Sequence, residues 1–268
     1  MKLHWLTVAM GLALAVPVGA QAQDQEQGQG QGQAQASDAT VESGEKVQVS
    51  GVKNPALRPY RIMARGLDAF DKHHALAPQA GLRFELWNAD GSVARADGLG
   101  LRLAGDKTDL ALPVDADATF VLPRSQEALD DDADLVLNRK KEQMGWRPRV
   151  RSPGVSVDAR RLGDMRLECE VSWAIMKDQV SFVLRTAMSA VGGMCHSPMT
   201  ALSYRAPKRL ASATLVSGER SRPLRLSADG STYIVPLRDK EWDNESLIVY
   251  RFADAAAPEP AVAAPVAP

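Results

Sequence analysis

The residue types best suited to chemistry lie together in one short segment of the chain. Met194, Cys195, His196 and Met199 supply thioethers, a thiol and an imidazole. Soft sulfur ligands combined with imidazole select copper(I), so Met194, His196 and Met199 form a candidate soft-metal site. The competing interpretation is structural, because a disulfide bond would consume the thiol of Cys195.

The beginning of the chain indicates export from the cytoplasm. Residues 1–22 combine an early lysine, an apolar run and an Ala-x-Ala motif, a pattern typical of a cleaved signal peptide. An uncleaved anchor is the alternative, but the apolar run is too short to span a bilayer stably. We therefore expect a soluble protein, periplasmic or secreted, with no transmembrane segment.

Two other segments lack the apolar residues that a folded core needs. Residues 23–44 are rich in Gln and Gly, and residues 254–268 are rich in Pro and Ala, so both are expected to be disordered. The formal net charge of −1 gives the chain no general attraction to nucleic acid. Together with export, this charge excludes nucleic acid as an expected partner.

The chain contains only two cysteines, Cys169 and Cys195. In an exported protein such a pair predicts one disulfide bond. Closing a loop of about 25 residues stabilises the folded state by about 3.5 kcal/mol in the chain-entropy model. A reactive thiol pair is the alternative, but the spacing is not that of a Cys-x-x-Cys motif.

Arg147, Arg149 and Arg151 alternate with other residues in the segment GWRPRVRSPGVS. Alternate side chains of an extended backbone point to the same side, so the three guanidinium groups would face one way. Such a face is a candidate anion-binding site for an acidic glycan or a phosphate-rich lipid. The alternative is a solvated linker that pairs with the acidic run EALDDDAD.

Two further groups of side chains are candidate metal ligands. The acidic run offers calcium the carboxylates of Asp130, Asp131, Asp132 and Asp134. Its spacing is not that of an EF-hand, and a solvated loop is the alternative. His73 and His74 are neighbours on a predicted helix, where adjacent side chains diverge, so they would need a third ligand such as Asp68 or Asp71. Their alternative role is to stabilise the C-terminal end of that helix.

The sequence shows no recognisable catalytic machinery. It lacks a Gly-x-Ser-x-Gly motif, and Cys195 and His196 are neighbours whose side chains would point apart in an extended segment. No spacing of acidic residues singles out a general acid and base. We therefore assign no catalytic residue and no cofactor, and a hydrolase of unknown type is the third functional hypothesis.

The first half of the chain predicts one helix followed by short strands. Apolar residues recur at helical spacing over about 55–75, up to Pro78. Apolar and polar residues then alternate in short runs separated by turn-forming residues. These predicted strands lie at 82–86, 99–103, 110–112, 120–122 and 135–137.

The second half predicts a similar mixture. Residues 167–175 alternate as in a strand, and a helical period follows over about 180–191, ending at Gly192 and Gly193. A single helix over 168–191 is the alternative, because apolar residues also recur there at a spacing of four. The remaining predicted strands lie at 211–217, 224–226, 232–235 and 247–252.

The two halves also resemble each other in sequence. DATFVLPRSQEALDDDADLVLNR, which begins at Asp117, matches SADGSTYIVPLRDKEWDNESLIVYRF, which begins at Ser227, with Thr119–Pro123 aligned on Thr232–Pro236. This match predicts an internal duplication in which both halves end in a strand–acidic turn–strand hairpin. The expected fold class is α+β, with two mainly antiparallel β-sandwich-like modules, each with one helix. The modules are expected at 45–144 and 157–253, with a linker at 145–156.

Two stretches carry a family resemblance. LRFELWNADGSVARADGLGLRLAG followed by LALPVDADATFVLP resembles transthyretin-like or carboxypeptidase-regulatory-like β-sandwich modules over about a third of the chain. The segment GVKNPALRPYRIMARGLDAFDKHHALAPQAGLRF, with MRLECEVSWAI downstream, is similar to exported bacterial proteins of unassigned function. The resemblance implies a periplasmic setting and binding or scaffolding, but no activity.

These observations favour a non-enzymatic binding or scaffolding protein. Its contact sites would be edge strands and the surfaces between modules. The ligand is unknown, and the candidate partners are another envelope protein or an anionic glycan or lipid. Soft-metal handling through residues 194–199 is the main alternative function.

Overall fold

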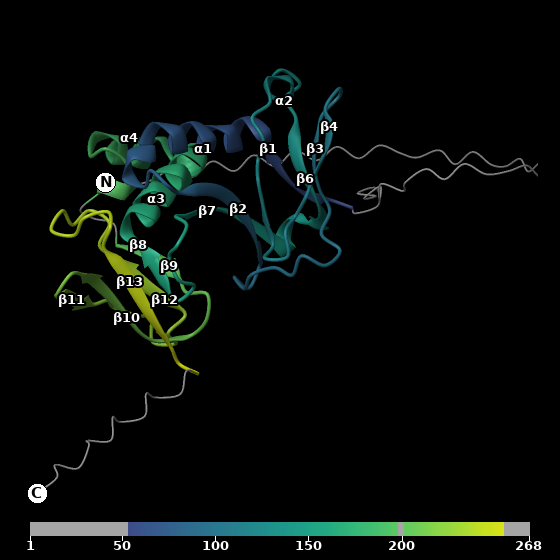
Figure 1. Cartoon of the computed structure of the whole chain (residues 1–268). Helices are drawn as coiled ribbons and strands as arrows, with labels where there is room; N and C mark the ends of the chain where they lie inside the picture. The colour runs from purple at the N-terminus through teal and green to yellow at the C-terminus, as the bar shows by residue number, and fades with distance from the viewer. Residues whose placement is uncertain (1–52, 198–200, 255–268) are drawn as a thin grey trace, which may run out of the picture. The chain divides into compact units, whose positions relative to one another are not determined.

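The computed structural model describes residues 53–197 and 201–254, and it confirms the α+β fold class (Figure 1). The predicted signal peptide, the predicted Gln/Gly-rich segment and nearly all of the predicted C-terminal tail lie outside the described residues. Within the described part of the chain, no helix is both long enough and apolar enough to cross a membrane.

In the first half, the described residues form two α-helices and six strands. The helices are α1 (Tyr60–His73) and α2 (Gln126–Asp130), with the short 3-10 helices η1 (His74–Leu76) and η2 (Lys141–Gln143). The strands are β1 (Pro55–Pro59), β2 (Gly81–Asn88), β3 (Leu101–Ala104), β4 (Asp109–Leu112), β5 (Thr119–Phe120) and β6 (Asp134–Lys140).

The second half begins after one additional strand, β7 (Met144–Arg151). Its helices are α3 (Leu162–Met176) and α4 (Phe182–Ala190), with η3 (Lys177–Gln179) and η4 (Met194–His196). Its strands are β8 (Ala159–Arg161), β9 (Leu202–Arg205), β10 (Leu210–Ser217), β11 (Arg220–Pro223), β12 (Thr232–Val235) and β13 (Leu247–Phe252).

The two halves have the same topology. The first half forms the sheet β1-β6-β3-β4 and pairs β2 with β5. The second half forms the sheet β8-β13-β10-β11 and pairs β9 with β12. In each half a short strand runs directly into the main helix, β1 into α1 and β8 into α3. Every described strand of one half therefore has a counterpart in the other except β7, which adds to β2.

This correspondence supports the predicted duplication but corrects one of its details. The matching segments do not form hairpins, because β5 and β6 belong to different sheets, as do β12 and β13. In both halves the main helix donates a hydrogen bond to the loop that follows the first of these strands, α1 to the loop after β5 and α3 to the loop after β12. The hydroxyl of Tyr60 donates to the carbonyl of Pro123, and Arg166 donates to the carbonyl of Leu237, at distances of 2.8 Å in both cases.

The predicted helix over 55–75 begins later than expected, because its first residues form β1. Pro59 favours an extended backbone at the residue before it, and it has no N–H to contribute at the start of α1. As β1 is an edge strand of its sheet, prolines are tolerated in it. From Tyr60 onwards the predicted helix is confirmed, with Tyr60, Met63 and Leu67 buried.

The predicted strand over 167–175 is wrong, because these residues belong to α3. This helix is buried on most sides, so its apolar residues satisfy both a helical and an alternating period. Glu168 and Glu170, which suggested a solvent-facing side, are themselves buried. The alternative of one helix over 168–191 is also incorrect, since η3 separates α3 from α4. The later helical prediction is confirmed by α4, although α4 has no buried residue.

The predicted linker at 145–156 is largely a strand. Residues 144–151 form β7, which pairs with β2 along its whole length. The arginines alternate here with Trp146, Pro148 and Val150, but this alternation did not predict a strand because proline usually interrupts strands. In β7 proline is tolerated because the strand order β5-β2-β7 places β7 at the sheet edge. The division of the chain into modules on either side of this segment remains a prediction.

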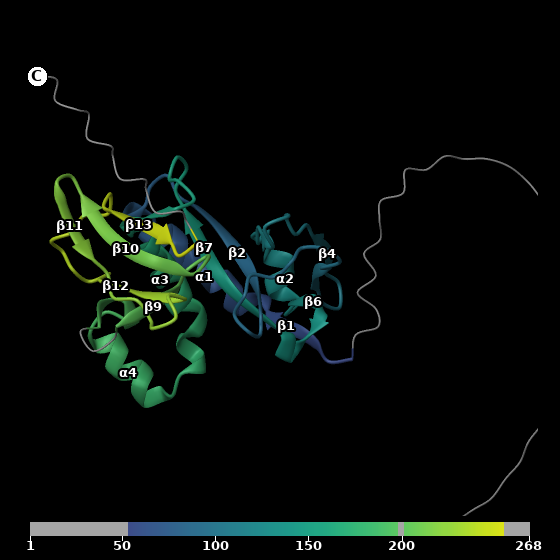
Figure 2. The same cartoon turned by 90° about the horizontal axis from the view of Figure 1, so that it is seen from below.

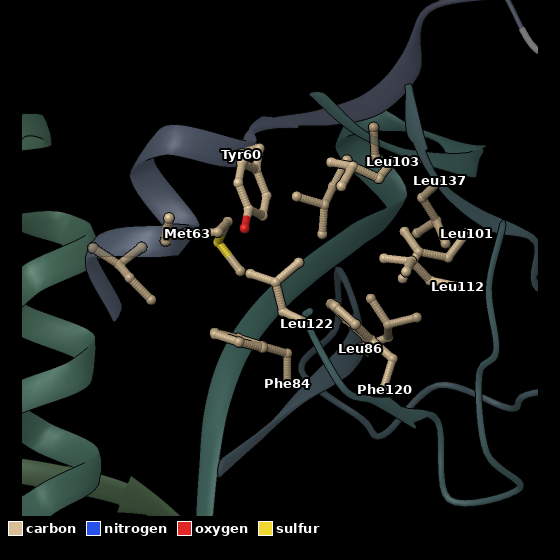
Figure 3. Close-up of a cluster of buried hydrophobic side chains, with 14 of the residues drawn as sticks. Tyr60, Met63, Phe84, Leu86, Leu101, Leu103, Leu112, Phe120, Leu122 and Leu137 are labelled. Atoms are coloured by element: carbon tan, nitrogen blue, oxygen red, sulfur yellow. The ribbon is translucent and has the colours of Figure 1, made fainter. Parts of the chain in front are cut away.

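Among the described residues, the buried apolar side chains form two large clusters and one small cluster, which consists of Ala77, Ala80, Val150 and Leu167. The first lies in the first half and includes Tyr60, Met63, Phe84 and Phe120, which converge in Figure 3. The second lies under β10, β12 and β13. Val171 and Ile175 of α3 join the first cluster, so α3 connects the two halves. The ribbon of β2 and β7 runs between the two four-stranded sheets in both views (Figures 1 and 2).

The contact between α1 and α3 explains the glycine within α1. A Cβ atom at Gly66 would lie 2.7 Å from Cδ1 of Ile175 and 3.2 Å from Cγ1 of Val171. A glycine at this position therefore lets the two helices approach closely.

Candidate functional site

The three alternating arginines of β7 lie on one side of the β2–β7 ribbon. Antiparallel pairing places Arg147 opposite Glu85, Arg149 opposite Arg83 and Arg151 opposite Gly81. Side chains that are directly opposite in a sheet share a face. The ribbon therefore presents a row of guanidinium groups, as expected for an extended segment with arginine at alternate positions.

Arg147 is fixed by a carboxylate and an aromatic ring. Its Nε donates to Oε2 of Glu85 at 2.8 Å, and its guanidinium carbon lies 3.3 Å from the centre of the Trp87 ring. The indole N–H of Trp87 donates to the same Glu85 oxygen at 2.9 Å. Glu85 is buried, so this carboxylate and the ring orient Arg147 firmly.

The other two arginines of β7 differ in how far they are neutralised. Arg149 donates to Oδ2 of Asp117 at 2.6 Å and has a weaker ion pair with Glu85. Arg151 donates only to the backbone carbonyl of Ala159, at 2.9 Å. Within the described residues, Arg151 has no carboxylate partner.

A buried ion pair, Arg160–Glu168, lies next to these arginines. Arg160, at 9% exposure, donates to Oε2 of Glu168 at 2.9 Å. The same carboxylate oxygen accepts the backbone N–H of Val150 at 2.9 Å, and Arg160 donates to the Val150 carbonyl. Burial alone would lower the pKa of Arg160, but the Glu168 carboxylate raises it above its ordinary value. These contacts join β7, β8 and α3 in one network.

These side chains line a partly enclosed cavity of about 90 Å³, which we call the arginine pocket. Its charged lining consists of five arginines and two glutamates, namely Arg147, Arg149, Arg151, Arg160, Arg205, Glu85 and Glu168. Three positive charges therefore lack a counter-charge within the lining. Arg205 comes from β9, so the pocket combines residues of both halves of the chain.

The electrostatics of the arginine pocket favour an added anion. Burial lowers the pKa of Arg147 and Arg151, and the neighbouring Arg160 lowers that of Arg151 further. A lowered pKa means that the charged guanidinium is less favourable there than in water. A bound anion would reverse this effect by supplying the missing opposite charge.

The arginine pocket is small, with a volume of about 90 Å³. A cavity needs only about 10–15 Å³ of such space to hold one water molecule, so the pocket has room for an oxyanion group such as a phosphate, a sulfate or a carboxylate. The charged end of a larger ligand therefore fits there.

The candidate soft-metal segment has other contacts in the structure. The predicted Cys169–Cys195 disulfide is confirmed, so Cys195 has no free thiol. His196 places its Nε2 2.8 Å from Oε1 of Glu170, while Met199 lies outside the described residues. The use of Met194, His196 and Met199 as ligands remains a prediction.

The structure brings together two histidines that the sequence had treated separately. Nε2 of His73 lies 3.8 Å from the second oxygen of Glu170, the carboxylate that His196 contacts with Nε2. Glu170 was missed because it was placed on the exposed side of a strand. The signal was its position directly after Cys169, since the disulfide brings it beside the residue that follows Cys195.

The acidic run forms α2 and the turn after it. Asp131 accepts the backbone N–H groups of Lys107 and Thr108, and Asp132 pairs with Arg61. Those hydrogen bonds lower the pKa of Asp131. Across residues 53–197 and 201–254, no three His, Cys, Asp or Glu side chains are arranged to hold a metal ion.

Comparison with known proteins adds no relative. No protein family matches the chain, and no curated protein or solved structure matches it significantly. The resemblance to transthyretin-like and carboxypeptidase-regulatory-like modules therefore rests on the sequence pattern alone.

Proposed function

We propose that this is an exported, non-enzymatic binding or scaffolding protein that binds an anionic group of its ligand in the arginine pocket. The observation that carries this proposal is the set of five arginines around one small cavity, whose lining contains two glutamates, while Asp117 outside the lining pairs with Arg149. Guanidinium groups bind oxyanions through paired charge-assisted hydrogen bonds, which suits recognition rather than reaction.

Export is supported by two independent features. The first 22 residues have the pattern of a cleaved signal peptide, and a disulfide bond is typical of proteins outside the cytoplasm. An acidic glycan, an anionic lipid or an acidic segment of an envelope protein would each present a suitable oxyanion in that compartment.

Arg151 is the residue on which the proposal depends most directly. Its guanidinium is half-buried and, among the residues that the structure describes, donates only to a backbone carbonyl, so most of its donors remain for a ligand. Arg147 and Arg149, by contrast, already pair with Glu85 and Asp117. Arg147 and Arg149 would add positive charge and form part of the lining of the arginine pocket.

Calorimetric titration with inorganic phosphate, sulfate and acetate tests the proposal. We expect saturable binding of at least one of these anions, weakened about tenfold or more in Arg151→Gln through the loss of a charge-assisted hydrogen bond. Arg61→Gln is the matched control, because it removes the same charge from an exposed ion pair outside the pocket. Equal affinities in the two variants would contradict the proposal.

A further inference from the structure

The two halves differ in the sheet that contains β2 in the first half and β9 in the second half. In the first half, the order β5-β2-β7 means that β7 covers the second edge of β2. In the second half, the corresponding strands stop at β12-β9. The edge of β9 that faces away from β12 therefore corresponds to the edge of β2 that pairs with β7.

The edge of β9 presents unpaired backbone groups. Ala206 donates its N–H to Ser231 across the β9–β12 pair, and the pairing alternates from there. The N–H and C=O groups of Ser203 and Arg205 therefore point away from β12. Both residues are exposed, and within the described part of the chain no backbone partner reaches them.

In the first half, the edge strand of the corresponding sheet is β7, and outward N–H groups near its C-terminal end have partners. The N–H groups of Val150 and Ser152 point away from β2, and carboxylates of α3 accept them. Glu168 binds the N–H of Val150 at 2.9 Å, and Asp164 binds that of Ser152 at 2.8 Å. Side chains of the protein thus cover that edge, whereas no such side chain covers Ser203 or Arg205 among the described residues.

We infer that β9 accepts an added strand from an extended, acidic peptide segment of a partner protein. Unpaired N–H and C=O groups of an edge strand are satisfied by another extended backbone, which is the mode of recognition called strand addition. In this interaction the partner's segment would take the place beside β9 that β7 takes beside β2.

The charge around β9 selects an acidic occupant. The segment ALSYRAPKRL, which contains β9, has three basic residues and no acidic one. Arg205 also lines the arginine pocket, where positive charge is already in excess. A second copy of this chain is a poorer occupant, because pairing β9 with itself would bring two basic segments together. The inference does not depend on anion binding in the pocket, since Ser203 is not part of its lining.

Ser203→Pro is the decisive variant. The N–H that proline removes points outward, so the pairing with β12 is kept while the added strand loses a donor. Ser221→Pro is the matched control, because Ser221 is an exposed residue of the edge strand β11 whose N–H also points outward. Thermal unfolding of both variants checks that the fold is retained.

The probe is a fluorescently labelled eight-residue peptide of alternating Glu and Val, followed by anisotropy. We expect binding to the full chain and to Ser221→Pro, with affinity at least tenfold lower for Ser203→Pro. A peptide of alternating Lys and Val, and a Glu–Val peptide N-methylated at alternate residues, should bind at least tenfold more weakly. Absence of binding, or equal affinities for Ser203→Pro and Ser221→Pro, overturns the inference. A dimer of the full chain that Ser203→Pro dissociates also overturns it, because a second copy would then occupy the edge.

Discussion

Oε1 of Glu170 lies 2.8 Å from Nε2 of His196, and these two residues directly follow the two cysteines of the disulfide. One covalent bond therefore holds η4 against α3 and sets this contact between an imidazole and a buried carboxylate. Gly192 and Gly193, both with positive φ, form the turn that leads from α4 back to η4. The disulfide thus anchors the segment that follows α4, a helix that buries none of its own residues.

Removal of the disulfide should destabilise the protein substantially. For Cys169→Ser/Cys195→Ser we expect a loss of about 3.5 kcal/mol in the free energy of unfolding, because the chain-entropy model assigns this value to a loop of about 25 residues. Urea unfolding of the oxidised protein and the double variant measures the difference. As a control, a reducing agent should destabilise the wild type but leave the double variant unchanged. Equal stability of the two proteins in the absence of reductant would show that the bond contributes little.

The buried ion pair between Arg160 and Glu168 should matter more than its exposed neighbour. Glu168→Gln leaves the charge of Arg160 buried without its partner, which costs about 3–5 kcal/mol in typical cases. Glu245→Gln breaks the pair with Arg161, where the Glu245 side chain is 66% exposed, and should cost about 1 kcal/mol or less. Urea unfolding midpoints of the two variants provide the comparison. A similar loss in both would mean that the network under the arginine pocket is not a buried one in solution.

The sequence predicts most clearly the parts of this fold that follow one regular apolar period. Buried and less buried residues alternate along β3 and from Ala213 along β10, and the buried residues of α1 recur at helical spacing. β2 alternates in sequence as well, although Phe84, Glu85, Leu86 and Trp87 are all buried. The cysteine count and the export pattern predicted the disulfide. The repeated Thr-to-Pro segment pointed to a duplication that the strand order of the two halves supports.

Elements buried on several sides carry no such pattern. α3 contacts α1 and β7 and contributes residues to all three apolar clusters, so its sequence fits a strand as well as a helix. For a related reason, the sequence indicated only some of the arginines that line the arginine pocket. Arg147, Arg149 and Arg151 share one strand and are visible as an alternation, whereas Arg160 and Arg205 come from β8 and β9 and reach the pocket only through tertiary packing.

Alkaline pH should destabilise the protein through two buried tyrosines. Burial raises the pKa of both Tyr233 and Tyr250, whose hydroxyl groups hydrogen-bond to each other. In the unfolded chain both ionise near pH 10, whereas the folded protein keeps their protons to higher pH. Because the folded state then binds more protons, the contribution of these two tyrosines to stability is fully present below about pH 9 and is lost as the pH rises beyond 10. Each tyrosine contributes about 1.4 kcal/mol per pH unit to that fall.

The double variant Tyr233→Phe/Tyr250→Phe isolates this effect. Removing both hydroxyls together leaves neither without a partner, so stability at pH 8 should change little. The fall between pH 9 and pH 11 should become shallower, because the unfolded variant has two fewer groups to ionise. Urea midpoints at pH 8, 9.5 and 11 test both expectations. If the wild type and the double variant lose stability equally over this range, the two tyrosines are not the groups responsible. The alkaline sensitivity would then come from another group, such as Tyr204, because burial raises its pKa as well.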